Sequence, residues 1–391
     1  MNKYLNKVYR ATLYVAFLFT CISNQSFGNV FKHNYLWVVR DAMTTQRKID
    51  HLIEFANKNN FDHLLVQIRG RGDALYSSEF VPRNSEISDS LFDPLDYVLK
   101  VGHENDIQIH AWMNMYILWS SENPPNNKNH LYYTHPEWID DGELYKDLND
   151  FTLTNFEKLN LKNGLYLSPY HEEVTPYLLN VLREVLEKYD IDGLHLDYIR
   201  YNNVENKNLD FDIKSDKKGI VVTSQVYLST EKAVENNGNE INYRNFKEED
   251  YKRNTITNLV MEIRKLISAL CPDCKLSAAV KPNIYLARDQ FFQEWDVWLV
   301  EGYLDFVMPM NYIPSLRKFT SNIDLIYENF PEKYREKIIM GISTYNQSPS
   351  EVVQKIDISR LREFPGISIF SYNVIKEKKS YYSKITKAIS E

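Results

Sequence analysis

Short apolar runs rich in β-branched and aromatic residues alternate along the chain with longer segments of helical period. The strand-like runs cover residues 35–40, 63–69, 107–114, 193–200, 275–281, 306–312, 338–344 and 367–373. Between the first two, apolar residues at Ile49, Leu52, Ile53 and Ala56 share one helical face behind an N-cap candidate, Thr45. Residues 256–270 repeat this pattern over a longer span. Strict alternation of strand and helix predicts a parallel sheet.

Eight strand–helix units predict a closed (β/α)₈ TIM barrel. The alternative is an open doubly wound sheet, which usually carries a glycine-rich phosphate loop after its first strand. Here the first strand-like run leads into Arg40-Asp41-Ala42-Met43, which contains no glycine. No internal repeat or low-complexity linker divides the chain. We therefore expect an α/β protein in which residues 29–391 form a single barrel domain.

Two connections are too long for ordinary βα loops. Residues 115–172 follow the third strand and carry Trp119 and Trp138, whereas residues 201–250 follow the fourth and are rich in Asn, Asp and Lys. Both leave the carboxyl ends of strands, where barrel enzymes keep their active sites, and loops of this length are usually functional or disordered. We expect the first to form a wall of the substrate site and the second to form a mobile lid.

The first 28 residues have the features of an export signal peptide. Lys3, Lys7 and Arg10 precede a short apolar segment at residues 11–23, and Ser26-Phe27-Gly28 offers small residues at the cleavage positions. The apolar segment is short for a membrane span. We expect an exported protein of the periplasm or cell envelope that has no membrane span in its mature form and begins near Asn29.

Two alternatives to cleavage remain open at this end of the chain. The segment could stay as an N-terminal anchor, or Cys21 could be lipidated, although Thr20 before it fits lipidation poorly. After export only Cys271 and Cys274 remain, in one turn. A zinc site needs about four ligands and a redox pair opens a helix, whereas this pair follows one. A local disulfide or two free thiols are expected, with no metal.

The composition modestly favours a carbohydrate partner. The net charge is −7, with no long basic run, which argues against nucleic acid. Hydrophobic residues make up 43% of the chain, enough for a core without a cofactor, and we expect a monomer. The 28 Tyr and six Trp residues exceed the needs of a core. Flat rings suit the apolar faces of an oligosaccharide or polysaccharide, although they also serve as ordinary packing.

The segment 192–201, Asp-Gly-Leu-His-Leu-Asp-Tyr-Ile-Arg-Tyr, is the strongest chemical signal. Strand alternation places His195, Asp197 and Ile199 on the face opposite Leu194 and Leu196. A core strand has little reason to turn His and Asp inward unless they line the barrel mouth. The structural alternative is a buried His–Asp pair, because a buried carboxylate needs a partner.

This segment is similar to the fourth-strand motif DG-[IL]-H-[LF]-D-[DY]-x-x-Y of the glycosyl-hydrolase-like family-ten proteins. Other blocks resemble that family in the same order: residues 66–76, 110–114, and 298–306 continuing into 308–312. The resemblance covers most of residues 35–372. It implies a barrel hydrolase of glycans, with bacterial cell-wall or related oligosaccharides among its substrates. Some relatives carry two adjacent acids on this strand, whereas here the second position is Tyr198.

Glycoside cleavage ordinarily needs two carboxyl groups. We predict that Asp197 is the first. For the second, Asp73 lies among Arg69 and Arg71, which suits an ionised base or stabiliser, or simply a salt bridge that orders the loop. Glu294 lies beside Trp295, where relatives tend to carry an acid, and an acid against an indole suits a proton donor. Its structural alternative is a solvated helix face.

Hydrogen-bonding and cationic groups at strand ends suit sugar hydroxyls, and we predict that several bind substrate. They are Arg69, Arg71, His110, Asn114, His195, Tyr198, Arg200, Lys281, Asn311, Tyr312 and Tyr372, with Asn283 and Asn373 at two further strand ends. Two other functions compete with the hydrolase. One is a non-catalytic carbohydrate-binding barrel, and the other is a metal-dependent deacetylase that uses His110, His195 and Asp197. The sequence leaves open the sugar, the linkage and the stereochemical outcome.

Overall fold

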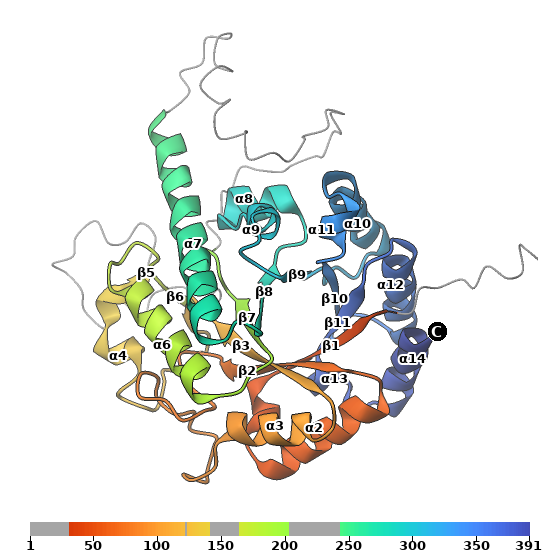
Figure 1. Ribbon diagram of the computed structural model, residues 1–391, viewed down its shortest axis with the longest axis horizontal. Helices are drawn as coiled ribbons and strands as arrows, with labels where there is room; N and C mark the ends of the chain where they lie inside the picture. The colour runs from red at the N-terminus through yellow and green to blue at the C-terminus, as the bar shows by residue number, and fades with distance from the viewer. Residues whose placement is uncertain (1–30, 122, 141–163, 203–242) are drawn as a thin grey trace, which may run out of the picture.

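The computed structural model describes residues 31–121, 123–140, 164–202 and 243–391 (Figure 1). The predicted signal peptide with Cys21 lies outside the described residues. So do most of the predicted lid over residues 201–250 and part of the predicted wall over residues 115–172. The described part of the chain contains the barrel and the helices that are named below.

Eight parallel strands form the barrel, and their sheet order is β10-β11-β1-β2-β3-β7-β8-β9. Parallel bridges from Val307 to Ile338 and from Met310 to Gly341 join β9 to β10 and complete the ring. The prediction of a (β/α)₈ barrel is confirmed. The strands are β1 (His33–Val38), β2 (His63–Arg69), β3 (Gln108–Asn114), β7 (Gly193–Asp197), β8 (Lys275–Val280), β9 (Phe306–Pro309), β10 (Ile339–Ser343) and β11 (Gly366–Phe370).

Helices pack around the outside of this ring, as Figure 1 shows. Thr45 caps the first long helix by accepting a hydrogen bond from the backbone N–H of Lys48, as the sequence predicts. The helices are η1 (Arg40–Met43), α2 (Gln46–Lys58), α3 (Pro94–His103), α4 (Leu131–Thr134), η2 (Pro136–Trp138), α6 (Val174–Lys188), α7 (Tyr243–Leu270), α8 (Ile284–Phe291), α9 (Trp295–Val300), α10 (Leu316–Asn329), α11 (Glu332–Arg335), α12 (Pro349–Leu361), α13 (Tyr372–Ile375) and α14 (Lys379–Ser390).

The two faces of the barrel strands bury different kinds of side chain. Leu194 and Leu196 face outward into the apolar layer between strands and helices. The inside of the barrel holds an aromatic cluster that includes Trp37 and Trp112, together with buried polar groups such as His195. The predicted inward orientation of His195 is therefore confirmed. Such an interior is more polar than the usual layers of branched aliphatic residues.

The fourth barrel strand is shorter than its apolar pattern suggests. β7 ends at Asp197, because Tyr198 has a positive φ of 52°, which turns the chain out of the strand. The predicted strand over residues 193–200 is therefore three residues too long. Ile199 packs in the outer apolar layer, so its predicted place on the inner face is wrong.

The connection after β3 contains a small antiparallel sheet in the order β4-β6-β5, formed by β4 (Ile117–Trp119), β5 (Ile139–Asp140) and β6 (Leu165–Leu167). Backbone hydrogen bonds hold the residues that lead into this sheet against the end of β7. Met115 N–H donates to the carbonyl of Asp197, and Tyr116 N–H donates to the carbonyl of Tyr198. Since it stands beside Asp197, the described part of this connection is in the position expected for a wall.

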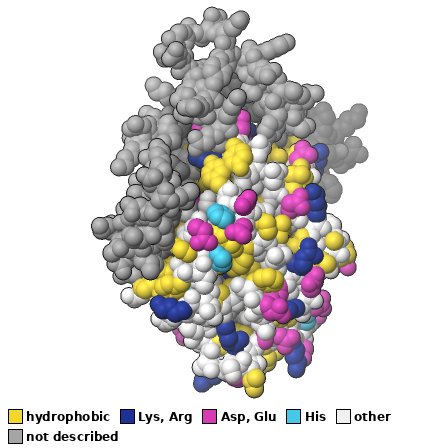
Figure 2. Space-filling model, turned by 90° about the vertical axis from the view of Figure 1, so that its left-hand side faces the viewer, with side chains coloured by type: hydrophobic (Ala, Val, Ile, Leu, Met, Phe, Trp, Pro, Cys, Tyr) yellow, Lys and Arg dark blue, Asp and Glu magenta, His cyan; other side chains and the backbone are white. Residues whose placement is uncertain are grey.

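Two further features bear on the sequence predictions. Cys271 and Cys274 form a disulfide, one of the two states expected for them. Among the described helices, none combines the length and the apolar character that a membrane crossing requires. The face seen in Figure 2 carries acidic and basic side chains interspersed among hydrophobic ones, so this face offers no continuous basic surface.

Candidate active site

Asp197 is the last residue of β7, and the strand carries it to the mouth of the barrel. Its side chain is buried, and one carboxylate oxygen accepts a hydrogen bond of 2.7 Å from the backbone N–H of Tyr198. Burial raises the pKa of Asp197. The Tyr198 N–H, the nearby charges of Arg200 and Lys281, and a hydrogen bond from Trp112 act in the opposite direction. A carboxyl group with a raised pKa suits a general acid.

The neighbouring strand β3 positions the groups around this carboxyl. The β3–β7 register pairs Trp112 with His195 and Asn114 with Asp197. The indole N–H of Trp112 donates to the side-chain oxygen of Asn114 at 2.9 Å, and the Asn114 amide donates to the Gly70 carbonyl at 2.7 Å. These bonds fix the orientation of both side chains beside Asp197.

Two cations lie close to Asp197 on a layer of aromatic rings. The Arg200 guanidinium is 4.9 Å from the ring centre of Tyr198 and 5.0 Å from that of Phe291. The Lys281 ammonium is 4.4 Å from the same Phe291 ring. Burial and the neighbouring charge of Arg200 together lower the pKa of Lys281 to about 8, against the opposite effect of Asp197. Lys281 is therefore charged below about pH 8 and stabilises ionised Asp197.

A group of aromatic side chains continues from Asp197 across the barrel mouth. The ring of Tyr312 is 5.2 Å from Phe370, which in turn is 6.1 Å from Tyr345 and 5.9 Å from Trp37. Tyr345 is 57% exposed, so its ring is open to a ligand. Flat, half-exposed rings beside a buried carboxyl form a surface on which a sugar ring can stack.

The hydroxyl of Tyr312 is buried and has no hydrogen-bond partner within the described part of the chain. The Asp197 charge is among the causes that raise the pKa of Tyr312 well above its usual value, after burial, so Tyr312 lies near the carboxyl and stays neutral. An unpaired buried hydroxyl costs free energy unless a ligand completes it. This hydroxyl is therefore available to a substrate oxygen.

Tyr312→Phe is expected to leave the free energy of unfolding unchanged or slightly higher, because the lost hydroxyl has no protein partner. Affinity or turnover with a bound glycan should fall about 10-fold, the range for one neutral hydrogen bond. Urea unfolding and glycan kinetics on the same preparation measure both. Tyr285→Phe, at a 40% exposed position of α8 where the hydroxyl donates to Asn329, is the control for losing a tyrosine hydroxyl away from Asp197. A loss of stability without any change in kinetics would contradict the assignment.

The structure places Glu294 differently from either interpretation of the sequence. Its side chain is buried, so the solvated helix face is wrong. Its carboxylate forms ion pairs with Arg288 at 3.1 Å and Arg253 at 3.6 Å, which hold the start of α9 against α7 and α8. It is not among the hydrogen-bond partners or neighbouring charges of Asp197. These contacts give Glu294 a structural role rather than the position of a second catalytic carboxyl.

Asp73 likewise has its oxygens occupied within the loop after β2. One accepts from the backbone N–H of Arg71 at 3.0 Å, and the other accepts from the amide of Asn84 at 2.5 Å. This arrangement orders the loop, as the structural interpretation expects, but through hydrogen bonds from a backbone N–H and an amide side chain rather than through a salt bridge. Arg71 also donates to the Ser120 hydroxyl at 3.0 Å and lies 5.8 Å from the Trp119 ring, so it contacts the wall formed by the connection after β3.

Several predicted substrate-binding residues make contacts away from Asp197. Arg69 is buried and donates to the backbone carbonyls of Asn114 and Met115. The amide of Asn311 donates to the Phe319 carbonyl, which fastens the end of β9 to α10. Tyr372 lies in α13 and packs edge-on against Phe55 of α2 at 5.2 Å, outside the barrel. The contacts of these three side chains hold the scaffold together, and their contact with substrate stays a prediction.

The two histidines of the predicted deacetylase site also lie deeper than expected. His110 is the third residue of β3, not its end, and its ring contacts His63 near the opposite end of the barrel. His195 is fully buried, with its Nδ1 2.8 Å from the Ser277 hydroxyl. Among the described residues, these two and Asp197 do not form a group whose ligand atoms converge. The structure therefore contradicts that metal site.

The structure thus groups Asn114, Tyr198, Arg200, Lys281 and Tyr312 with Asp197, and the charge of Arg71 acts on Tyr198 from beside the wall. It also adds Trp112, Tyr166, Phe291, Tyr345 and Phe370, which the sequence analysis does not select. Trp112 could have been predicted from the sequence, because it lies two residues before Asn114 and therefore on the same inner face of β3. Phe370 is the last residue of β11, whereas Tyr345 follows β10, Phe291 ends α8 and Tyr166 lies in the wall, where no periodicity identifies them.

Comparison with known proteins agrees with this architecture. The glycoside hydrolase domain of PgaB (BpsB) from Bordetella bronchiseptica superimposes with a TM-score of 0.62 at 10% identity, over 92% of this chain and 99% of that one. Alpha-L-fucosidase isoenzyme 2 from Paenibacillus thiaminolyticus superimposes with a TM-score of 0.56 at 14% identity, over 91% of this chain and 49% of that one. At these identities the likeness establishes the fold.

Relatives found by sequence identify the family of this chain, whereas the solved structures establish only its fold. Glycosyl hydrolase YngK from Bacillus subtilis is 21% identical over 67% of this chain and 48% of its own length. Glycosyl hydrolase DigH from Escherichia coli K12 is 21% identical over 78% of this chain and 66% of its own length. The chain thus spans about half to two thirds of these relatives. The profile of the glycosyl hydrolase-like 10 family matches residues 27–356, so the chain belongs to the glycosyl hydrolase-like 10 family.

Proposed function

We propose that this protein is an exported glycoside hydrolase that cleaves a bacterial cell-wall glycan or a related oligosaccharide or polysaccharide, with Asp197 as the general acid. The observation that carries the proposal is the position of Asp197, a buried carboxyl with a raised pKa at the carboxyl end of a barrel strand. A proton donor for a glycosidic oxygen must hold its proton near the working pH.

The groups around Asp197 support this role. Tyr345 and Phe370 offer ring faces for a sugar, and the Tyr312 hydroxyl and Asn114 amide can orient its oxygens. Once Asp197 has given up its proton, Arg200 and Lys281 stabilise the carboxylate that remains. Aromatic and neutral polar groups therefore hold the glycan, whereas Arg200 and Lys281 stabilise the ionised form of Asp197.

The second catalytic group need not come from the protein. In some glycosidases the substrate's own acetamido group takes the place of the second carboxyl. Since neither Asp73 nor Glu294 is placed beside Asp197, a glycan with N-acetylated sugars fits this site better than a neutral glucan. We expect cleavage of N-acetylated strands and little cleavage of the same strands after de-N-acetylation.

The test is incubation of residues 29–391 with purified cell-wall glycan strands, their de-N-acetylated form and an unrelated glucan, followed by mass spectrometry of the products. Shorter oligosaccharides from the first substrate support the proposal. Binding of all three without products would instead support the competing function, a non-catalytic carbohydrate-binding barrel. The observation that favours this competitor is the structural use of Asp73 and Glu294.

Export is supported by two independent features. The charged and apolar pattern of residues 1–28 has the form of a signal peptide. The disulfide between Cys271 and Cys274 is of a kind that persists in oxidising compartments outside the cytoplasm. We expect the native protein in the cell envelope fraction with its first residue near Asn29. An intact Met1 found in the cytosolic fraction by N-terminal sequencing would contradict export.

Lys281→Gln is expected to move the alkaline limb of the pH–rate profile to higher pH. Lys281 acts to lower the pKa of Asp197, so its removal raises that pKa further. An acid works only while protonated, and activity is lost as the pH rises through its pKa; that loss should therefore come later in the variant. Turnover measured between about pH 4 and pH 9 covers the usual pKa of a carboxyl group and the pKa of about 8 for Lys281, and so gives both limbs.

The exposed Lys100→Gln on α3 is the matched control and should leave the profile unchanged. The direction in which the pH–rate profile moves in Lys281→Gln also identifies the role of Asp197. If the ionised form were required, the acid limb rather than the alkaline limb would move to higher pH. An identical profile in Lys281→Gln and wild type would show that Lys281 does not influence the reacting carboxyl.

A further inference from the structure

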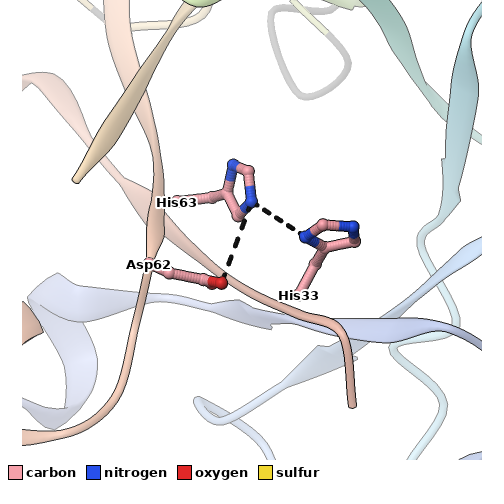
Figure 3. A group of neighbouring side chains, drawn as sticks. All are labelled: His33, Asp62 and His63. Atoms are coloured by element: carbon pink, nitrogen blue, oxygen red, sulfur yellow. Dashed lines mark hydrogen bonds and ion pairs between the residues drawn. The ribbon is translucent and has the colours of Figure 1, made fainter. Parts of the chain in front are cut away.

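Three potential metal ligands meet at the opposite end of the barrel from Asp197. His33 opens β1, His63 opens β2, and Asp62 immediately precedes His63. Because all barrel strands run parallel, these residues share the amino-terminal rim, whereas Asp197 ends β7 at the other rim. Figure 3 shows the three side chains pointing toward one another, and their ligand atoms all lie within 4.8 Å of one another.

The distances within this cluster suit a tetrahedral ion. Nδ1 of His33 is 3.1 Å from Nε2 of His63, and that nitrogen is 3.9 Å from Oδ2 of Asp62. Two nitrogens bound to zinc at about 2.05 Å with a tetrahedral angle are about 3.3 Å apart. The separation of the two nitrogens is thus close to that in a zinc site. The two rings share a hydrogen bond in this structure, and an ion would replace it as both lone pairs turn toward the metal.

The groups behind the ligands orient them as they would in a metal site. Nδ1 of His63 lies 3.0 Å from Nε2 of His110, which leaves Nε2 of His63 directed at the cluster. The other carboxylate oxygen of Asp62 accepts from the backbone N–H of Asn34 at 2.7 Å, which leaves Oδ2 for the ion. Such outer contacts set the tautomer and direction of metal-binding histidines and carboxylates.

Solvent access and charge also fit an ion. His63 is buried, whereas His33 and Asp62 are partly exposed. The Asp62 side chain is 47% exposed, so an ion can enter from the rim. Asp62 supplies a carboxylate oxygen beside the two imidazole nitrogens.

We propose that His33, Asp62 and His63 bind a divalent transition-metal ion of the zinc class at the amino-terminal rim of the barrel. Two imidazoles and one carboxylate fill three positions of a tetrahedron, and a water fills the fourth. The ion joins the first residue of β1 to the first residue of β2 and so fastens the start of the barrel. Its role is structural, because the glycan site lies at the other rim.

The test uses residues 29–391 without a polyhistidine tag, stripped with a chelator and then titrated with Zn²⁺ against a competing chromophoric chelator. One Zn²⁺ per chain is expected, with a higher melting temperature in the bound form. His33→Gln and Asp62→Asn should each weaken binding by a factor of about 100 or more, since even outer-contact changes cost 10- to 100-fold. His51→Ala, an exposed histidine on α2, should bind as wild type does.

Zinc-edge X-ray absorption of the wild-type protein tests the site without any variant. It should show two imidazole nitrogens at about 2.0 Å. Glycan turnover should be the same in the stripped and loaded protein, which separates this site from the proposed catalysis. Binding of much less than one ion per chain, equal affinity in His33→Gln and wild type, or a shell without two imidazoles would overturn the proposal.

Discussion

Asp197→Asn is expected to lower glycan turnover by a factor of about 10² or more, the range for losing one general acid or base. Asparagine has nearly the same shape but no proton of suitable acidity to donate. The fold should survive, because Asn can still accept the hydrogen bond from Tyr198 N–H and the variant removes a costly buried charge. Affinity for an intact glycan should persist, because Tyr345, Phe370 and Asn114 are unchanged.

A matched control lies five residues earlier, at the other end of the same strand motif. Asp192 accepts from the backbone N–H of Ile109 at 2.6 Å and pairs with His103 at 2.9 Å, contacts that hold β7 to β3 and α3. Asp192→Asn should therefore lower the melting temperature with little change in turnover per folded molecule. Melting temperature, affinity and turnover together distinguish the two patterns. A stable and fully active Asp197→Asn protein would remove Asp197 from the reaction.

The barrel could be predicted from sequence because its signals are local. Each strand is a short β-rich run, each helix carries its own apolar face, and the order of these units specifies the architecture. The strand ends were less predictable, because the predicted runs 193–200, 306–312 and 367–373 each continue three residues past β7, β9 and β11. At the end of β7, Tyr198 takes a left-handed φ that a bulky residue rarely adopts. No propensity predicts such a turn, and yet it is this turn that places the Tyr198 N–H on the Asp197 carboxylate.

The site was less predictable because its contacts join distant segments. Asp197 could be predicted because alternation and a motif select it. The structural use of Glu294 depends on Arg253 and Arg288, which come from two different helices. The convergence of His33 and His63 likewise depends on the parallel pairing of β1 with β2, which brings residues 30 positions apart into contact. Sequence spacing alone contains neither relationship.

Gly193→Ala is expected to lower the free energy of unfolding by about 3 kcal/mol, at the upper end of the usual cost of overpacking a core. A Cβ at this position would lie 2.2 Å from Nδ1 of His110 and 2.8 Å from the carbonyl oxygen of Lys275. His110 cannot turn aside freely, because it is buried and bonded to His63 at 3.0 Å. The Lys275 carbonyl is backbone of β8, so relief requires β7 to move away from its neighbour.

Gly302→Ala separates this crowding from the ordinary cost of replacing glycine. Gly302 has a φ of 73° and no atom within 4 Å of an added Cβ, so only backbone strain of about 1 kcal/mol is expected. Urea unfolding of both variants should therefore place Gly193→Ala about 2 kcal/mol below Gly302→Ala. Equal losses of unfolding free energy in the two variants would show that the start of β7 has room for an added Cβ. Because β7 runs only from Gly193 to Asp197, a displaced strand should also lower turnover per folded molecule, whereas Gly302→Ala should leave turnover unchanged.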